Sequence, residues 1–225
     1  MLIEHNFIII LKKATDIAKG QGMHHVYDII RKFRTVRKFK SKPVPEKLLL
    51  KLADAARLAP SASNIQPCEF ILVNKPKKVS ETFECIDWEQ SAFPNGEPRP
   101  HERPTAYLIV LVDLIKKRRG GGSDAAAAAE NAVLAASELG LGTCWTYSLH
   151  RKRLKKHLRI PHHLNVDSVI AFGYPDESPV LEESQGPTRP WMDREGVVHV
   201  PKRRLADVCT MNGYRHTSPD ARKPA

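Results

Sequence analysis

Residues 59–70 read APSASNIQPCEF and lie between two apolar segments. Over residues 48–59, apolar side chains recur at helical spacing, whereas residues 70–73 form a continuous apolar run of strand length. Pro60 cannot continue the helix, and Pro67 closes the turn that follows. The stretch therefore predicts an ordered connection between a helix and a buried strand, with short polar side chains presented between the prolines.

These polar side chains are suited to contact a small ligand. Ser61, Ser63, Asn64 and Gln66 supply short donors and acceptors that can bind a planar heterocycle or a polyol without carrying charge. The alternative is an Asn- and Ser-rich loop that only caps a helix. Taken alone, this stretch does not decide between the two.

The composition is that of a globular protein with one domain of ordinary size. The chain has 225 residues, of which 41% are hydrophobic and 27% charged. The longest N-terminal apolar run, residues 7–11, is far shorter than the roughly 20 residues of a membrane-spanning helix. It also lacks the basic start and the cleavage site of a signal peptide. We therefore expect a cytoplasmic protein that does not enter a membrane.

The patterns typical of several other protein classes are missing from the sequence. The four cysteines form no C-x-x-C pair, and the histidine doublets at 24–25 and 162–163 lack the spacing of a helical metal site, so we expect no metal. The excess of 36 Lys and Arg over 25 Asp and Glu raises the question of nucleic acid. Because the basic residues of 151–159 alternate with leucines, as in an amphipathic helix, and no aromatics lie among them, we expect no nucleic-acid binding.

A second polar motif, residues 34–39, follows a predicted helix over residues 24–33. Arg34 and Arg37 stand three residues apart, and the hydroxyl of Thr35 lies between them. This combination suits a ligand that carries a phosphate and a second electron-rich group. The alternative is an exposed basic turn at the end of a helix.

In their order and spacing, the two motifs resemble those of the nitroreductase family, R-R-S-x-R-x-F and A-P-S-x-x-N-x-Q-P-W. The sequence departs from this pattern at Phe33, where an arginine is usual, at Thr35 for serine and at Cys68 for tryptophan. Thr35 keeps the hydroxyl. Phe33 removes one expected contact to the phosphate or ribityl group of the ligand.

Two further segments agree with the same family. Residues 140–148, GLGTCWTYS, resemble its G-L-G-x-x-W segment, and residues 202–205, KRRL, resemble its C-terminal basic segment. The resemblance implies that the main-chain amides of residues 146–148 face the isoalloxazine ring, and that the basic segment reaches the flavin phosphate. Lys202 and Arg204 would lie on one side of an extended segment, so we prefer them to Arg203.

The resemblance implies an α+β fold with a mixed, mainly antiparallel sheet flanked by helices. It further implies a homodimer formed through a central helix, with FMN at the subunit interface, and substrate-pocket roles for Trp88 and Phe93. Residues 60–64 would contact the flavin bound mainly by the partner. The predicted cofactor-binding residues are Arg34, Thr35, Arg37, Pro60, Ser61, Ala62, Ser63, Asn64, Gln66, Thr146, Tyr147, Ser148, Lys202 and Arg204.

The activity implied by the resemblance is that of an FMN-dependent NAD(P)H oxidoreductase. NADPH or NADH would deliver hydride to flavin N5, and an electron-poor small molecule such as a nitroaromatic or a quinone would then be reduced. Arg37 would give electrostatic support near N1 and O2, and no other catalytic side chain is required. The alternatives are dehalogenation, enone reduction or flavin fragmentation on the same scaffold, a non-catalytic flavin-binding protein, or a basic nucleic-acid-binding module.

The sequence divides into three parts. We expect residues 1–22 to form an N-terminal extension that ends at a Gly-rich hinge. Because the sequence pattern changes at this hinge, we hypothesise that translation begins at Met23. Residues 23–208 form the flavin-binding domain, and residues 209–225 are expected to be a disordered tail. Within the domain we expect a loop with one short helix over 81–102, strands at 104–113 and 166–173, an extended arm over 191–200, and an Ala-rich helix over 125–139 that Ser123 and Gly140 cap.

Overall fold

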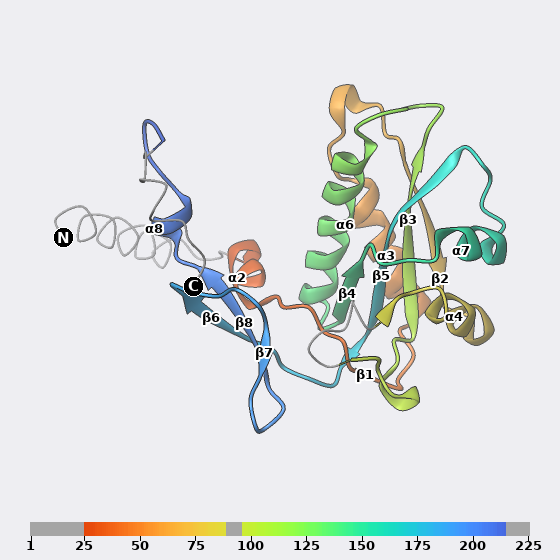
Figure 1. The fold of residues 1–225 in the computed structure, drawn as a ribbon. Coiled ribbons are helices and arrows are strands. Elements are labelled where there is room, and N and C mark those ends of the chain that lie inside the picture. Colours follow the sequence, from red (N-terminus) through yellow and green to blue (C-terminus); the bar gives the residue numbers. More distant parts are fainter. Residues whose placement is uncertain (1–24, 89–95, 215–225) are drawn as a thin grey trace.

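The computed structural model describes residues 25–88 and 96–214 (Figure 1). They form a main body and a smaller C-terminal sheet. The helices are α2 (His25–Lys32), α3 (Glu46–Arg57), α4 (Pro76–Phe83), α6 (Gly121–Glu138), α7 (Arg151–Leu158) and α8 (Leu205–Val208). The strands are β1 (Phe39–Lys40), β2 (Cys68–Val73), β3 (Ala106–Asp113), β4 (Gly142–Thr146), β5 (Leu164–Pro175), β6 (Val180–Ser184), β7 (Trp191–Met192) and β8 (Val198–Arg203).

The main body is built on an antiparallel sheet in the order β1-β5-β3-β2. β4 pairs with residues 169–173 of β5, and β1 continues along the same edge at Tyr174 and Pro175. The C-terminal sheet adds a parallel pair, β6 with β8, and an antiparallel pair, β7 with β8. The α+β fold with mixed, mainly antiparallel sheets is therefore confirmed, as are the strands predicted at 70–73, 104–113 and 166–173.

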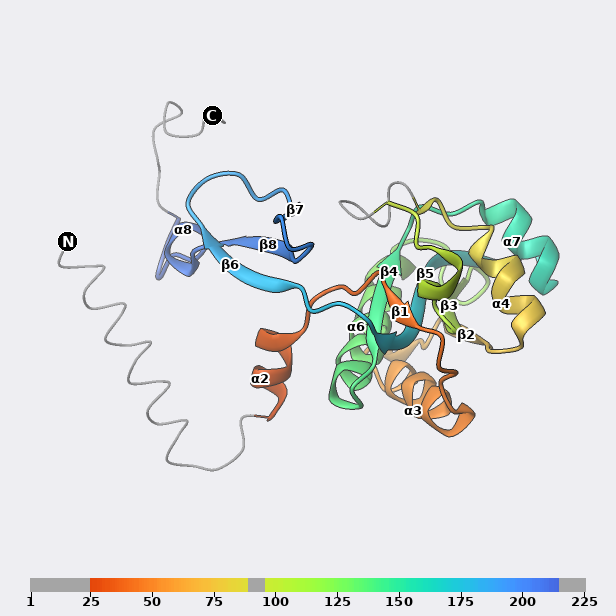
Figure 2. The same ribbon diagram turned by 90° about the horizontal axis from the view of Figure 1, so that it is seen from below.

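The main sheet is covered on both faces (Figure 2). All eight residues of β3 are buried, and their side chains alternate between two apolar clusters. Leu108 and Val110 face the cluster that contains α3 and α6, whereas Tyr107 and Ile109 face the cluster that contains Phe83 of α4 and residues of α7. This burial explains why β3 reads as a continuous apolar run in the sequence.

The Ala-rich helix is confirmed as α6, but it begins earlier than the sequence predicts. The cap is Gly120, not Ser123, and its φ of +74° is a left-handed conformation that glycine adopts without strain. A side chain at Gly121 would place its Cβ 2.4 Å from Cγ1 of Val112, so the first turn packs closely on β3. At the other end Leu139 is the C-cap, and Gly140, with a φ of +72°, follows it in the left-handed conformation typical of a helix end.

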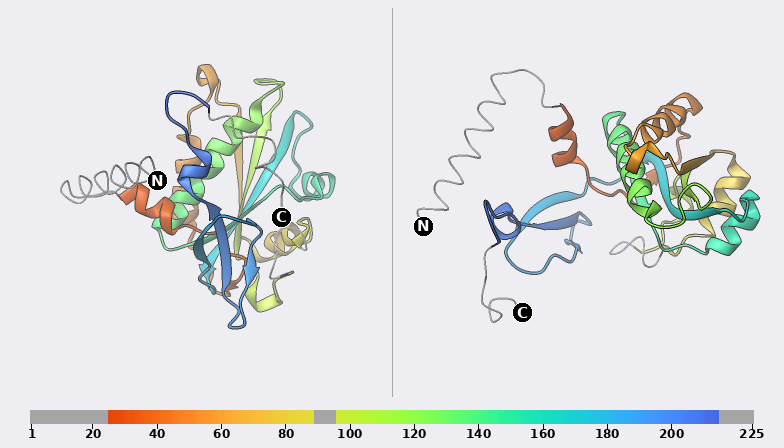
Figure 3. Two further views of the ribbon diagram at one scale, coloured as in Figure 1. Left: turned by 60° about the vertical axis from the view of Figure 1, so that its left-hand side comes forward. Right: turned by 90° about the horizontal axis from the view of Figure 1, so that it is seen from above.

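The C-terminal sheet and α2 lie beside the main body (Figure 3). They carry exposed apolar side chains, among them Val26 and Tyr27 on α2 and Trp191 on β7. The extended arm predicted over residues 191–200 is present in β7 and β8. Residues 209–214 are exposed and contain neither helix nor strand, whereas the predicted extension over residues 1–22 and the last part of the predicted tail lie outside the described residues.

The segment predicted as a loop with one short helix over residues 81–102 does contain helical residues. It contains the end of α4 and a short 3-10 turn at Pro100–Glu102, while residues 89–95 lie outside the described part of the chain. None of the helices within residues 25–88 and 96–214 is both long enough and apolar enough to span a bilayer.

Candidate active site

The motif that begins at Arg34 lies against the edge strand β4. The amide of Val36 donates to the carbonyl of Thr143 in β4 (2.8 Å). The two chains approach so closely here that a Cβ at Gly142 would lie 2.9 Å from Cβ of Val36. Gly142 therefore provides the space that Val36 occupies.

The charges of this motif are partly buried. The guanidinium of Arg34 donates to the carbonyl of Phe33, and the Nε of Arg34 is buried without a partner among the described residues. Burial lowers the pKa of Arg34. Glu177, which follows β5, accepts bonds from the amides of Arg37 and Lys38. Sequence reasoning missed Glu177 because its contact joins residues 139 and 140 positions apart.

Phe33 stands where the family pattern has an arginine, and the structure gives it a packing role. Its side chain packs against the apolar cluster of α3 and α6. A residue at the boundary of the core therefore replaces the arginine of the family motif, and Arg34 and Arg37 remain as the arginines of this segment.

The residue that follows β4 offers a main-chain donor near the predicted ring site. The carbonyl of Thr143 points away from β5, toward Val36. Because the main-chain groups of successive residues point to opposite sides of a strand, the amide and carbonyl of Thr146 point toward β5. The amide of Ser148 donates to Oγ1 of Thr146 (3.1 Å). Of the three predicted amides, that of Tyr147 is thus the one for which the described residues provide no acceptor.

The 60–66 loop is ordered but conformationally strained. Ser63, Asn64 and Gln66 have φ values of 51°, 53° and 51°, in the left-handed region that costs non-glycine residues about 1–2 kcal/mol each. Oγ of Ser61 accepts a bond from the amide of Gln66 (2.9 Å) and closes the loop. The loop lines a cavity of about 220 Å³ together with Cys68 and Asp124.

The structure places the two leading motifs at opposite ends of α6 (Figure 1). The amide of Ala62 in the 60–66 loop donates to Oδ1 of Asp124 in the first turn of α6 (3.3 Å), whereas Val36 lies at the start of β4, just beyond the end of α6. A helix of 18 residues is about 27 Å long. A single chain therefore does not bring the two motifs together.

The C-terminal bases belong to the C-terminal sheet. Lys202 is exposed at the end of β8. Arg204 follows β8 and pairs with both carboxylate oxygens of Asp207 (3.0 Å each), and the guanidinium of Arg203 donates to the carbonyl of the same residue (2.8 Å). The sequence did not reveal that Asp207 partly neutralises this basic segment.

The predicted substrate-pocket residues are not brought together with these motifs. Trp88 is 3% exposed, stacks on Phe83 with ring centroids 4.9 Å apart, and donates from Nε1 to the carbonyl of Phe83 (3.2 Å). Packing alone explains these contacts, so a role in substrate binding stays a prediction. Phe93 lies outside the described residues.

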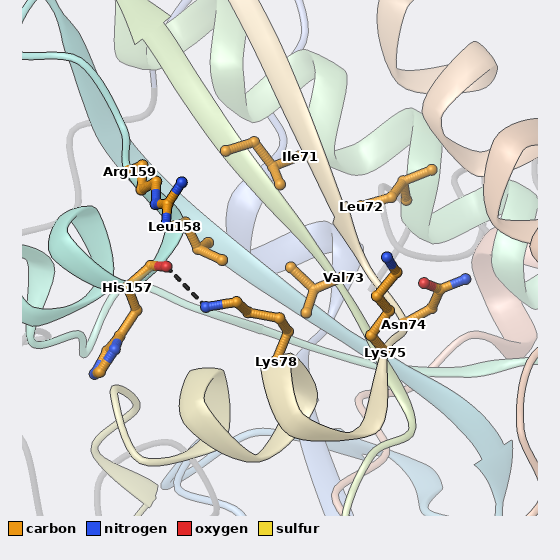
Figure 4. Close-up of a pocket in the computed structure, with 9 residues that line it drawn as sticks. All are labelled: Ile71, Leu72, Val73, Asn74, Lys75, Lys78, His157, Leu158 and Arg159. Atoms are coloured by element: carbon orange, nitrogen blue, oxygen red, sulfur yellow. Dashed lines mark hydrogen bonds between the residues drawn. The ribbon is translucent and has the colours of Figure 1, made fainter.

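A second cavity of about 380 Å³ lies away from these motifs (Figure 4). Its walls come from the end of β2, the start of α4 and the end of α7, and none of the predicted site residues lines it. Lys78 crosses it to donate to the carbonyl of His157 (3.0 Å). We place the candidate site at the first two motifs, because they carry most of the predicted site residues and none of those residues lines this cavity.

The described residues contain neither a group of metal ligands nor, at Cys68 and Cys144, an ionised thiol. Within residues 25–88 and 96–214, no three His, Cys, Asp or Glu side chains are grouped as metal ligands. Burial raises the pKa of both Cys68 and Cys144 to about 11, so both thiols are protonated at neutral pH.

Comparisons with known proteins agree with the fold and the motifs. The family model described as "Nitroreductase family" matches residues 30–174. A protein of Methanothermobacter thermautotrophicus named "Putative NADH dehydrogenase/NAD(P)H nitroreductase" is 31% identical over 169 residues, which cover 73% of this chain and 84% of that protein. The crystal structure of a protein of the same name from Parabacteroides distasonis has a TM-score of 0.64 and 26% identity, over 85% of this chain and 100% of that one.

A third match, at lower identity, shows the fold alone. It is a "putative nitroreductase in complex with fmn" from Desulfovibrio desulfuricans, with a TM-score of 0.64 and 21% identity, over 86% of this chain and 99% of that one. Because the family model matches more than half of its residues, the chain belongs to the nitroreductase family.

Proposed function

We propose that this protein is an FMN-dependent NAD(P)H oxidoreductase that reduces electron-poor small molecules such as nitroaromatics or quinones. The observation that carries the proposal is the contact of Val36 with β4, which places the segment of Arg34 and Arg37 beside this strand. The residue that follows β4, Tyr147, has an amide without an acceptor among the described residues. Cations and a free main-chain donor along one strand edge suit a ligand with both a phosphate and a flat heterocycle. Membership of the nitroreductase family supports the same conclusion.

The residues of this edge fit FMN in kind. When bound, FMN supplies the redox chemistry by taking two electrons from NADPH or NADH and passing them to the acceptor. In this proposal Arg34 and Thr35 bind the phosphate and ribityl groups, and the amide of Tyr147 donates to the ring. Arg37 stabilises negative charge on the pyrimidine side of the ring. No further acid or base is required of the protein.

The proposed active site is shared by the two chains of a homodimer. The 60–66 loop lies at the far end of α6 from Arg34 and Arg37, so a second chain that packs along α6 in the opposite direction would bring its own loop to this site. Ala126 and Ala127 of α6 are only half-buried in one chain, and side chains this small allow such close packing between helices. The apolar side chains of α2 and of the C-terminal sheet are exposed in one chain and would be covered in the same dimer.

The visible spectrum of the purified protein, followed without oxygen, tests the proposal. After incubation with FMN, we expect flavin bands that bleach on addition of NADPH or NADH and return when a quinone or nitroaromatic is added. The Arg37→Ala variant should be reduced more slowly. A colourless protein would contradict the proposal, and bands that no nicotinamide bleaches would favour a non-catalytic flavoprotein. Reoxidation only by halogenated compounds or enones would favour the other reactions of this scaffold.

A further inference from the structure

The residue after the 60–66 loop, Pro67, is hydrogen-bonded to the end of β3, where the segment that connects β3 to α6 begins. The carbonyl of Pro67 accepts a bond from the amide of Asp113 (2.8 Å), at the end of β3. The carboxylate of Asp113 accepts a bond from the amide of Ile115 (2.8 Å), and its carbonyl accepts one from the amide of Lys117 (3.0 Å). These contacts fix the position of Lys117 relative to the end of the loop.

Lys117 in turn fixes Asp124. Its ammonium pairs with Oδ2 of Asp124 (2.5 Å), and the two side chains are 17% and 8% exposed. At this burial water screens the pair weakly, so the carboxylate is held in one orientation. The other oxygen, Oδ1, accepts the bond from the amide of Ala62 in the 60–66 loop (3.3 Å).

The loop needs such a contact from outside. A stretch with three non-glycine residues in left-handed conformations keeps its shape only where the surrounding structure determines it. The bonds from Gln66 to Ser61 and from Asn64 to Ser61 are internal to the loop and move with it. The bond from Ala62 to Asp124 ties the middle of the loop to α6.

We propose that Asp124 is a positioning residue, which holds the 60–66 loop in the shape in which it contacts the flavin bound by the neighbouring chain. This inference rests on the proposed function. Lys117 acts one step further away, since it orients the carboxylate but does not touch the loop. The oxygen that accepts from Ala62 is the feature required of residue 124, and its charge serves only to satisfy Lys117.

The test separates the acceptor from the ion pair by comparing two double variants. Both contain Lys117→Met, which removes the charged partner and keeps most of the side-chain volume. One adds Asp124→Asn, which keeps an oxygen that can accept from Ala62, and the other adds Asp124→Leu, which does not. The exposed pair of Asp54 and Arg57 on α3 provides the matched control Asp54→Asn.

Two measurements are made on each full-length variant. The dissociation constant of FMN should stay within about threefold of the wild-type value for the Asn variant and the control, and should rise about tenfold for the Leu variant, as expected for the loss of one hydrogen bond. Hydrogen exchange of residues 60–66 in the flavin-free protein should be faster in the Leu variant alone.

Ala62→Pro provides a second variant if the Leu variant does not fold. It removes the donor instead of the acceptor and leaves the ion pair intact. Ser61 is extended (φ −134°, ψ 152°), and a proline at the first position of a helical turn is tolerated after such a residue. We expect exchange over residues 63–66 to become faster, as in the Leu variant.

Equal FMN affinity and equal exchange in the Asn and Leu variants would overturn the proposal, as would unchanged exchange in Ala62→Pro. If the wild-type protein does not bind FMN, the proposed function fails and the link to flavin fails with it. The exchange measurement then still decides whether Asp124 holds the loop, because it needs no cofactor.

Discussion

The main sheet and the C-terminal sheet are stabilised by different forces. Every residue of β3 is buried between two apolar clusters, so hydrophobic burial holds the main sheet together. In the C-terminal sheet both residues of β7 are exposed, and β8 contributes only Val198 and Pro201 to the buried set. One chain thus contains a complete apolar core in its main body, whereas the C-terminal sheet of residues 180–203, called the arm below, has almost none.

Polar contacts hold the arm in the isolated chain. The ring of His199 on β8 contacts Glu182 of β6 through Nδ1 (2.5 Å) and Asp193 through Nε2 (3.1 Å). Trp191 of β7 stacks on this ring with centroids 4.0 Å apart and donates to the same Glu182 (3.1 Å). One histidine thus connects all three strands of a sheet that has almost no apolar core.

The largest expected difference between the two sheets comes from removing an apolar side chain. Phe172→Ala in β5 empties a fully buried position and should lower the free energy of unfolding by about 3–5 kcal/mol. Leu181→Ala in β6 shortens a side chain that is 46% exposed and should change the free energy of unfolding by no more than about 0.5 kcal/mol. Denaturant unfolding followed by circular dichroism measures both, and a similar loss in the two variants would contradict the comparison.

A glycine substitution tests the close packing of the first motif on the main sheet. Gly142→Ala would bring a Cβ to 2.9 Å from Cβ of Val36 and should lower the free energy of unfolding by about 1–3 kcal/mol. FMN affinity should fall with it, because the displaced segment carries Arg34 and Arg37. Thermal unfolding and fluorescence titration with FMN measure the two effects.

The matched control lies in the arm. No atom within 4 Å would meet a Cβ at Gly186, so Gly186→Ala should leave stability unchanged or raise it by about 0.4–1 kcal/mol. A stability loss equal to that of Gly142→Ala would show that close packing at Val36 is not the cause.

The smallest expected effect is a dependence of the arm on pH. Hydrogen bonds from the His199 ring to Asp193 and then to Glu182 raise the pKa of His199. The protonated ring can donate to both carboxylates, so this stabilisation is fully present below the unfolded pKa of about 6.5 and is lost as the pH rises through the folded value. Hydrogen exchange of residues 180–203, corrected for its intrinsic pH dependence, should therefore become faster at alkaline pH.

His199→Gln removes the titrating group from the arm and should abolish this pH dependence while leaving the exchange of β3 unchanged. A pH dependence that persists in the variant would assign the effect to another group.

The sequence predicted those features of the fold that depend on local pattern. The strands β2, β3 and β5 and the helix α6 follow from apolar runs and periodicity, and the order of the motifs identified the family. Contacts between distant residues could not be predicted in this way. Glu177 meets Arg37 and Lys38 across 140 and 139 positions, and Asp124 meets Ala62 across 62.

Gly142 and Ser123 show that the local sequence does not reveal which distant residue a position packs against or where a helix begins. Gly142 makes room for Val36, a packing partner that is remote in sequence. Ser123 has the side chain of a helix cap, but the left-handed Gly120 starts α6 before the chain reaches it. The roles of the site residues toward FMN stay predictions.

The central claim is that one active site takes the Arg34 motif from one chain and the 60–66 loop from the other. Mixed dimers test it most directly. Arg37→Glu damages the first motif, and Asn64→Asp replaces an amide donor with a charge at a residue that tolerates its left-handed φ of 53°. Each variant alone should bind FMN at least about tenfold more weakly than the wild type.

The decisive measurement is the FMN affinity and NADPH-dependent activity of a heterodimer purified through two different tags, with one variant in each chain. If the site is shared, one of its two sites carries both substitutions and the other carries neither, so wild-type affinity and about half of the wild-type activity should return. If each site is formed within one chain, both sites stay damaged. No recovery would contradict the account.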